Sequence, residues 1–233
     1  MSQYLPYILI SNQVKDEMAN QAPAEVKIAR AINAEVRNIN TKYDVDSAMR
    51  SVAVSLVTDG SVEYKLNDLS TTDDIRKVKS LRLVTDNLAY LSRVDFEDFM
   101  HDVDFSAHKN QYTTYYKNGF EYIRVMTLNY SSTVEGLTMN YLTSNLAIDA
   151  SGNFYPEIVS GGSLSVLLPE SYLDLVSLGA QKRLFYQSIG ESDATQVALV
   201  RNRYDSELKK LGLSDTAKEI ERKSNKIKLR KQW

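Results

Sequence analysis

The spacing of apolar residues changes from a helical period to a strand period near Arg50, and this change constrains the fold most strongly. Before it, apolar residues recur every three or four positions and predict one buried stripe on a helix over residues 23–42. The stripe consists of Ile28, Ile32, Val36 and Ile39. After Arg50, apolar and small polar residues alternate over 51–57, as in a strand with one buried face. The chain therefore combines helices with a sheet.

Helices are predicted at both ends of the chain. Residues 6–20 precede the helix over 23–42, where Pro23 suits a first helical turn. In the last third, two apolar segments that end at glycines predict helices over 169–190 and 192–212. The charged residues of the second helix lie mostly outside its apolar stripe. They are Lys27, Arg30, Glu35 and Arg37.

Strands are predicted between these two groups of helices. Asp59-Gly60 separates two alternating runs and predicts a hairpin, and Asn118-Gly119 predicts another. Residues 75–84 and 137–143 are further extended runs. Ser92 is in a position to cap a short helix that carries Asp95, Glu97 and Asp98.

This order of elements predicts an α+β fold, in which N- and C-terminal helices form a helical bundle with an inserted antiparallel β-sheet domain. Residues 1–48 and 167–213 would form the helical core. Residues 49–166 would form the β-rich domain, and residues 214–233 a basic C-terminal arm.

Charge is distributed unevenly along the chain. The net charge is -2, but residues 217–233 carry seven basic and two acidic side chains, a net of +5 that leaves −7 for the first 216 residues. A basic segment on an acidic body indicates an acidic partner, either nucleic acid or an acidic protein surface. A solvated tail without a partner is the alternative.

Composition excludes several classes of protein. The chain has no cysteine, so it has no disulfide, thiol nucleophile or thiolate metal site. No apolar run approaches the ~18 residues of a transmembrane helix, and the N-terminus lacks the basic start of a secretory signal. We expect no membrane association, no export, and no cofactor.

Candidate catalytic and metal sites are weak. His101 and His108 are the only histidines. The densest carboxylates are Asp95, Glu97, Asp98, Asp102 and Asp104. Read as a calcium loop from Asp102, this stretch has Ala107 in place of the turn glycine and Thr113 in place of the bidentate glutamate. Gly161-Gly162 lacks the spacing of a phosphate-binding loop and predicts a turn. We expect no enzymatic activity and no metal site, with carboxylate-based hydrolysis as the last-ranked alternative.

Fifteen tyrosines offer a possible stacking surface for nucleic-acid bases. Those near the predicted sheet are Tyr112, Tyr115, Tyr116, Tyr122, Tyr130 and Tyr141. Few basic residues lie among them, and aromatic residues are also common in strands and protein interfaces. Nucleic-acid binding through this sheet and the basic tail is therefore the second hypothesis.

Five stretches, in this order, give residues 5–212 a resemblance to a family of virion proteins. They are AINAEVRNI at 31–39, SVAVSLVTDGSVEYKLNDL at 51–69, LAYLSRVDFEDF at 88–99, YYKNGFEYIRVM at 115–126 and LLPESYLDLVSLGAQKRLFYQSIGESDATQVALVRNRYDSEL at 167–208. The series resembles the head-to-tail adaptor, or connector, proteins of tailed bacteriophages. The proline that commonly follows the Tyr-x-Leu strand is absent after Leu66, and residues 214–233 lie outside the pattern.

The resemblance implies a structural virion protein at the neck between capsid and tail, assembled in the host cytoplasm. Such proteins form a ring, commonly of twelve copies, that attaches to the portal protein and to tail or nozzle proteins. Packaged double-stranded DNA passes through the channel without sequence-specific binding, is retained, and leaves during DNA ejection. An acidic body would repel the phosphate backbone.

The basic tail would be the arm that docks on the portal protein. Its candidate portal-binding residues are Lys218, Arg222, Lys223, Lys226, Lys228, Arg230, Lys231 and Trp233. The cations would complement an acidic surface and the tryptophan would be an aromatic anchor. A tail-side neck protein is the nearest alternative within the structural class.

Overall fold

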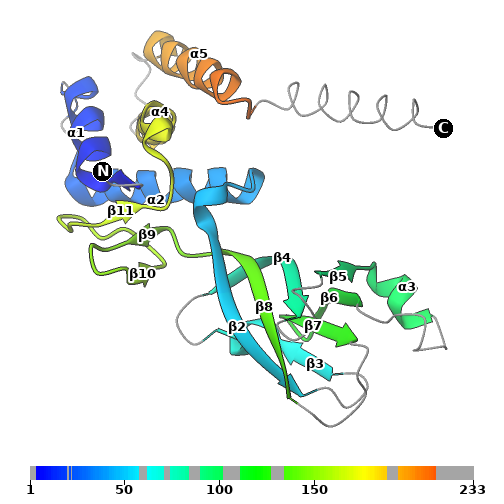
Figure 1. The fold of residues 1–233 in the computed structure, drawn as a ribbon. Helices are drawn as coiled ribbons and strands as arrows, with labels where there is room; N and C mark the ends of the chain where they lie inside the picture. The colour runs from blue at the N-terminus through cyan, green and yellow to red at the C-terminus, as the bar shows by residue number, and fades with distance from the viewer. Residues whose placement is uncertain are drawn as a thin grey trace. The chain divides into compact units, whose positions relative to one another are not determined.

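The computed structural model describes residues 4–19, 21, 23–57, 62–70, 74–83, 90–101, 111–126, 134–187 and 194–213. Internal contacts divide the chain into two units (Figure 1). The first unit comprises Met1–Ser47 and Leu146–Trp233, and the second comprises Ala48–Asn145. Among the helices of the described residues, none is long and apolar enough to cross a membrane.

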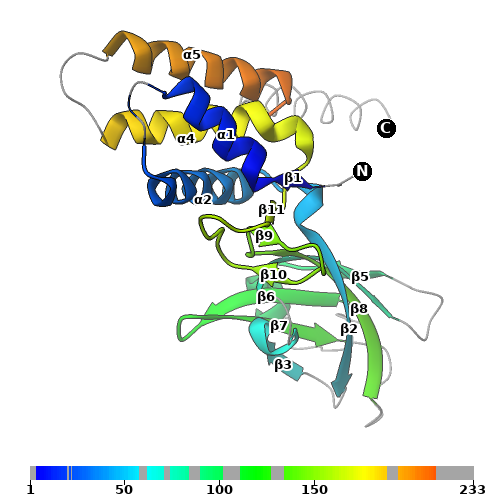
Figure 2. The same ribbon diagram turned by 90° about the vertical axis from the view of Figure 1, so that its left-hand side faces the viewer.

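Four helices form one layer of the first unit. They are α1 (Tyr7–Glu17), α2 (Glu25–Lys42), α4 (Leu173–Gln187), which follows the 3-10 turn η4 (Glu170–Tyr172), and α5 (Ala194–Lys210). Helix α4 lies between α2 and α5, and α1 crosses it (Figure 2). Because α4 has neighbours on three sides, every residue from Leu175 to Gln181 is buried. The apolar stripe predicted on α2 is confirmed, since all four of its residues are fully buried.

The first unit also contains a four-stranded sheet, so the prediction of a helical bundle with one inserted sheet is wrong. Its order is β1 (Leu5–Pro6), β11 (Ser165–Val166), β9 (Ala147–Ile148) and β10 (Phe154–Tyr155). Each strand has two residues, which is too short for an alternating pattern to be recognised. Residues 146–166 therefore lie with the helices in the first unit.

The second unit is built on a curled seven-stranded sheet. Its order is β2 (Met49–Val57), β8 (Val134–Thr143), β4 (Ile75–Leu83), β5 (Tyr90–Arg93), β6 (Gln111–Lys117), β7 (Phe120–Met126) and β3 (Val62–Lys65). The short helix α3 (Phe96–His101) follows β5, and the 3-10 turns η1 (Asp46–Ala48) and η2 (Leu66–Asp68) flank β2 and β3. The broad α+β class stands, but the chain is richer in sheet than predicted.

The large sheet is mixed, not antiparallel as predicted. Strands β5 and β6 are parallel, with Ser92 paired to Gln111, whereas the other pairs are antiparallel. A parallel pair needs a crossover connection, and α3 lies on the connection from β5 to β6. Ser92 lies within β5, so the prediction that it caps the short helix is wrong.

One predicted hairpin is confirmed and the other is wrong. Strands β6 and β7 pair around Asn118 and Gly119, which both have the positive φ of a two-residue turn. Strand β2 instead pairs along its whole length with β8, and β3 pairs with β7. The apolar residues of β8 alternate in register with those of β2. Burial of these long-range pairs therefore outweighs the local turn signal at Asp59-Gly60. The Asp59-Gly60 pair itself lies outside the described residues.

The packing of α2 can be tested with one substitution at two positions. Ile32 is fully buried and Ile8 is 54% exposed. We expect Ile32→Ala to lower the free energy of unfolding by about 2–5 kcal/mol, because it leaves a cavity. Ile8→Ala should change it by less than about 0.5 kcal/mol. Urea denaturation followed by circular dichroism measures both, and equal losses would contradict the assigned core.

Candidate functional site

A fully buried carboxylate, that of Glu35, lies where α2, α4 and α5 meet. The Tyr204 hydroxyl of α5 donates to Oε1 at 2.6 Å, and Arg183 Nε of α4 donates to Oε2 at 3.0 Å. Asn38 Nδ2, one turn along α2, also donates to Oε1 at 3.3 Å. Both oxygens therefore have donors, as a buried charge requires.

Gly179 allows α4 to approach this carboxylate. A Cβ atom at position 179 would lie 2.3 Å from Cγ and 2.4 Å from Cδ of Glu35, closer than nonbonded atoms can come. The absence of a side chain therefore sets the distance between α2 and α4 at the level of Glu35.

Two neighbouring groups respond electrostatically to this site. Burial raises the pKa of Tyr204, and the negative charge of Glu35 raises it further, so the hydroxyl remains a donor at neutral pH. Lys182 Nζ lies 3.8 Å from the centroid of the Tyr204 ring, a cation–π contact. Burial lowers the pKa of Lys182, and the charge of Glu35 opposes that shift.

A second carboxylate, Glu25, joins α1 to the first turn of α2. The Tyr7 hydroxyl and Ser11 Oγ donate to its Oε1 at 2.6 and 2.8 Å, and Lys15 forms an ion pair with it. Burial alone would raise the pKa of Glu25, but the hydrogen bonds from Lys15, Tyr7 and Ser11 outweigh burial and lower it.

Asn33 of α2 holds the loop between β10 and β11. Its Nδ2 donates to the Ile158 carbonyl at 2.9 Å, and the Ile158 amide donates to its Oδ1 at 2.8 Å. Asn33 is buried, and an ion pair of 3.1 Å joins Arg37 to Glu157 beside it. The loop is therefore fixed to α2 at two successive residues.

The described residues exclude the predicted arm and part of the predicted carboxylate cluster. The portal-binding candidates from Lys218 to Trp233 lie outside the described residues, as do Asp102, Asp104 and His108. Glu97 and Asp98 lie exposed on α3. Within the described residues no group of three or more potential metal ligands occurs. Gly161 has a positive φ and lies in the β10–β11 loop, in agreement with a turn.

Among the described residues, the six tyrosines predicted near the sheet do not form an open stacking surface. Tyr112 and Tyr141 are buried, and Tyr130 lies outside the described residues. The ring of Tyr115 stacks on Phe96 at 4.4 Å and lies 6.1 Å from the ring of Tyr122. Among the six, Tyr116 is highly exposed, at 77%. Two of these rings are buried and two engage other rings, which leaves few of them open for stacking on bases.

Sequence reasoning missed the Glu35 site, although a signal was present. That reasoning counts Glu35 among the charged residues that lie mostly outside the apolar stripe. The spacing of Ile28, Ile32, Glu35 and Ile39 is nevertheless four, three and four residues. That spacing lies on one helix face. The partners Arg183 and Tyr204 are distant in sequence, so spacing alone cannot pair them with Glu35.

Comparisons with known proteins give no assignment, because no family model and no curated protein matches this chain.

Gly179→Ala tests the close approach of α4. Alanine normally stabilises the interior of a helix by about 0.5–1 kcal/mol relative to glycine, so a loss of stability must come from the clash with Glu35. We expect a loss of about 1–3 kcal/mol in thermal or urea unfolding. Gly162→Ala is the control, since its Cβ would meet nothing closer than 3.4 Å. In a Glu35→Ala background the Gly179→Ala loss should shrink, and strict additivity would refute the contact.

Glu25→Gln tests the charged cluster through pH. A carboxyl group with a lowered pKa in the folded state stabilises the fold above its unfolded pKa, about 4.3, and this contribution disappears as the pH falls through the folded value. We expect the variant to be less stable than the parent by about 1 kcal/mol at pH 7, and the gap to close below about pH 4. Unfolding free energies from pH 2 to 7 measure this. Glu170→Gln, at an exposed glutamate, is the control and should show no such gap.

Proposed function

We propose that this protein is a structural subunit of a tailed bacteriophage neck: a head-to-tail adaptor whose copies form a ring on the portal, join capsid to tail and surround the DNA channel. The observation that carries the proposal is the contact between two of the stretches that resemble the adaptor family. Glu35 belongs to the 31–39 stretch, and Gly179, Arg183 and Tyr204 belong to the 167–208 stretch. These are the residues that join α2, α4 and α5 around one carboxylate.

The chemistry of this site supports a structural role. Three donors occupy the Glu35 carboxylate, and α4 approaches it closely at Gly179, so the carboxylate is fully buried and engaged within the fold. Glu25 and Glu17 are likewise engaged, in ion pairs with Lys15 and Arg203. In the described part of the first unit, these charged groups connect helices to one another. A subunit that bears load between capsid and tail needs helices fixed in this way.

The charge distribution supports the proposed partners. A body with a net charge of −7 suits a channel wall past which DNA slides, because it does not attract phosphates. The basic residues 217–233 would dock on an acidic surface of the portal, as the arm of each subunit. Twelve copies, with tail or nozzle proteins below the ring, complete the proposed assembly.

Native mass spectrometry with the portal ring encoded in the same genome tests this proposal. We expect the full-length chain to add to the portal ring as a ring of copies. A chain that remains monomeric, does not bind the portal and binds DNA in a salt-dependent manner would overturn the proposal in favour of nucleic-acid binding. Assembly with tail proteins alone would favour a tail-side neck protein.

Charge reversal tests the arm within the full-length chain. The triple variant Lys223→Glu, Lys226→Glu and Lys228→Glu should bind the portal about tenfold more weakly, at roughly 0.5 kcal/mol for each exposed ion pair. The matched control reverses Lys27, Arg201 and Lys209, three exposed cations on α2 and α5. Equal affinities of the two variants, measured by surface plasmon resonance, would refute the arm.

A further inference from the structure

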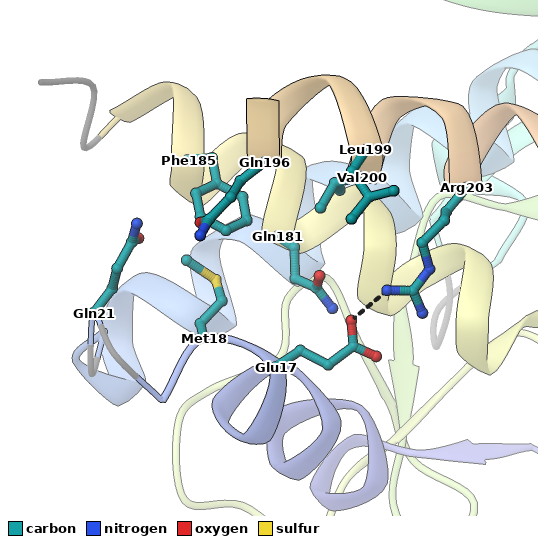
Figure 3. A pocket seen from close by; sticks show the side chains of 9 residues that line it. All are labelled: Glu17, Met18, Gln21, Gln181, Phe185, Gln196, Leu199, Val200 and Arg203. Carbon is teal, nitrogen blue, oxygen red and sulfur yellow. Dashed lines mark hydrogen bonds and ion pairs between the residues drawn. The ribbon is translucent and has the colours of Figure 1, made fainter. Parts of the chain in front are cut away.

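An open pocket of about 200 Å³ lies between the end of α1, α4 and α5 in the first unit (Figure 3). Its charged residues, Glu17 and Arg203, form an ion pair with each other. Gln181 also lines the pocket but is 1% exposed, so its amide is closed off from an occupant. The described lining therefore presents no buried polar group that would select a ligand. The large sheet of the second unit makes a more definite demand on a partner.

This sheet has two edge strands, β2 and β3 (Figure 1). They differ in how far they are protected from pairing with another chain. Strand β3 has four residues, of which Glu63 and Lys65 are charged, and the turn η2 follows it directly. Short length and charge both hinder the addition of a further strand. The β3 edge is therefore protected in the way that is usual for sheets of monomeric proteins.

Strand β2 has none of these protections. It is nine residues long, contains no proline, and carries Arg50 as its one charged residue. It pairs with β8 along its whole length without a register shift, so no bulge twists the edge away. Among the residues that the structure describes, no strand pairs with its other side. A long and regular edge of this kind is a template for a strand from another molecule.

The side chains of β2 leave this edge accessible and incomplete. Ser51 and Ala53, which are small, are exposed on one face of the strand. Val52 and Val54 lie on the other face, in register with buried apolar residues of β8. Val54 is buried, whereas Val52 is only partly buried where it packs against the core of the second unit. A further strand with an apolar residue opposite Val52 would complete its burial.

The sequence of β2 matches itself in an antiparallel pair. Residues 51–55 read Ser-Val-Ala-Val-Ser in both directions. An antiparallel pair centred on Ala53 places Val52 of one copy opposite Val54 of the other. The partly buried valine of each copy then gains the apolar neighbour that it lacks. The same register places serine opposite serine, so the alternation of apolar and small residues continues from one copy to the other.

The charge on the strand is compatible with this register. The two copies of Arg50 would lie at opposite ends of the pair, six residues apart along it, which is roughly 20 Å. This separation exceeds the Debye length of about 8–10 Å, so the two positive charges repel each other only weakly. An in-register parallel pair would instead place the two arginines side by side, where like charges are destabilising. The charge therefore favours the antiparallel arrangement.

We propose that two copies of the free chain pair through their β2 strands, antiparallel and centred on Ala53, about a twofold axis. The same patch serves both copies, so the contact closes at two and removes the exposed edge as a site of aggregation. Neighbours in the proposed ring are related by rotation about the ring axis instead. The pair therefore belongs to the chain before assembly, and the inference does not rest on the proposed function.

Single cysteines in the cysteine-free chain test the contact and its register. In the pair, Ala53 lies opposite its own equivalent, where Cβ atoms are about 4.5–5.5 Å apart. Oxidised Ala53→Cys should therefore give a covalent dimer on a non-reducing gel. Ser51→Cys is the matched control, because it is exposed on the same face but its two copies would lie four residues apart, roughly 13 Å. Equal cross-linking at both positions would overturn the register.

Charge at position 53 tests the association without a cross-link. Lysines directly opposite each other repel, so Ala53→Lys should raise the dissociation constant of the dimer about fivefold in analytical ultracentrifugation. Its circular dichroism spectrum should match that of the parent chain, because the side chain at position 53 is exposed. Ala53→Glu should weaken the dimer similarly, whereas a mixture of the two variants should regain the parent affinity. Unchanged association of Ala53→Lys would overturn the contact.

Sedimentation of the parent chain decides the proposal as a whole. A dimer that cross-links at position 53 supports the pair, whereas a monomer, or a dimer that does not cross-link there, would overturn it. A monomeric parent chain whose Ala53→Lys variant no longer joins the portal ring would assign the edge to a strand of the portal protein instead. The proposed ring is judged separately, by the binding of the parent chain to the portal, so the two failures are distinguishable.

Discussion

The helical layer depends on one buried negative charge. Removing a carboxylate from water costs several kcal/mol, and Glu35 offsets this cost with donors from its own helix and from two others. If one partner were removed, an uncompensated charge would remain, at a cost of about 3–5 kcal/mol. The geometry is consequently more restrictive than apolar packing alone. Tyr204 and Arg183 must both reach the carboxylate, which defines how α4 and α5 lie along α2.

Gly179 and Glu35 form one unit in this arrangement. The close approach at Gly179 is needed because Glu35 occupies the volume that a side chain on α4 would fill. Helix α4 is buried on three sides, so its polar groups must have hydrogen-bond partners. Glu35 accepts from Arg183, and Ser177 donates to Gln13 of α1 at 3.1 Å. Gln181 is the exception on this helix, since its buried Nε2 has no hydrogen-bond partner among the described residues.

Local patterns predicted the elements better than they predicted their partners. The helix over 23–42 and the hairpin around Asn118-Gly119 rest on contacts between residues close in sequence, and periodicity or turn chemistry reports these directly. The pairing of β2 with β8 joins residues about 85 apart, and no short-range signal encodes it. Two-residue strands such as β9 have no period at all. The sequence spacing alone indicates that Glu35 lies on the apolar face of its helix. Its partners Arg183 and Tyr204 are identified only by the three-dimensional structure.

The buried polar groups of the described first unit fall into those that have hydrogen-bond partners and a few that have none. Glu35, Glu25 and Asn33 have their hydrogen-bonding capacity met inside the unit, so they serve the fold. Gln181 Nε2 and both side-chain polar atoms of Asn40 have no hydrogen-bond partner among the described residues. Each such group lowers the stability of the folded unit, because its loss of hydrogen bonds to water is not compensated inside the protein.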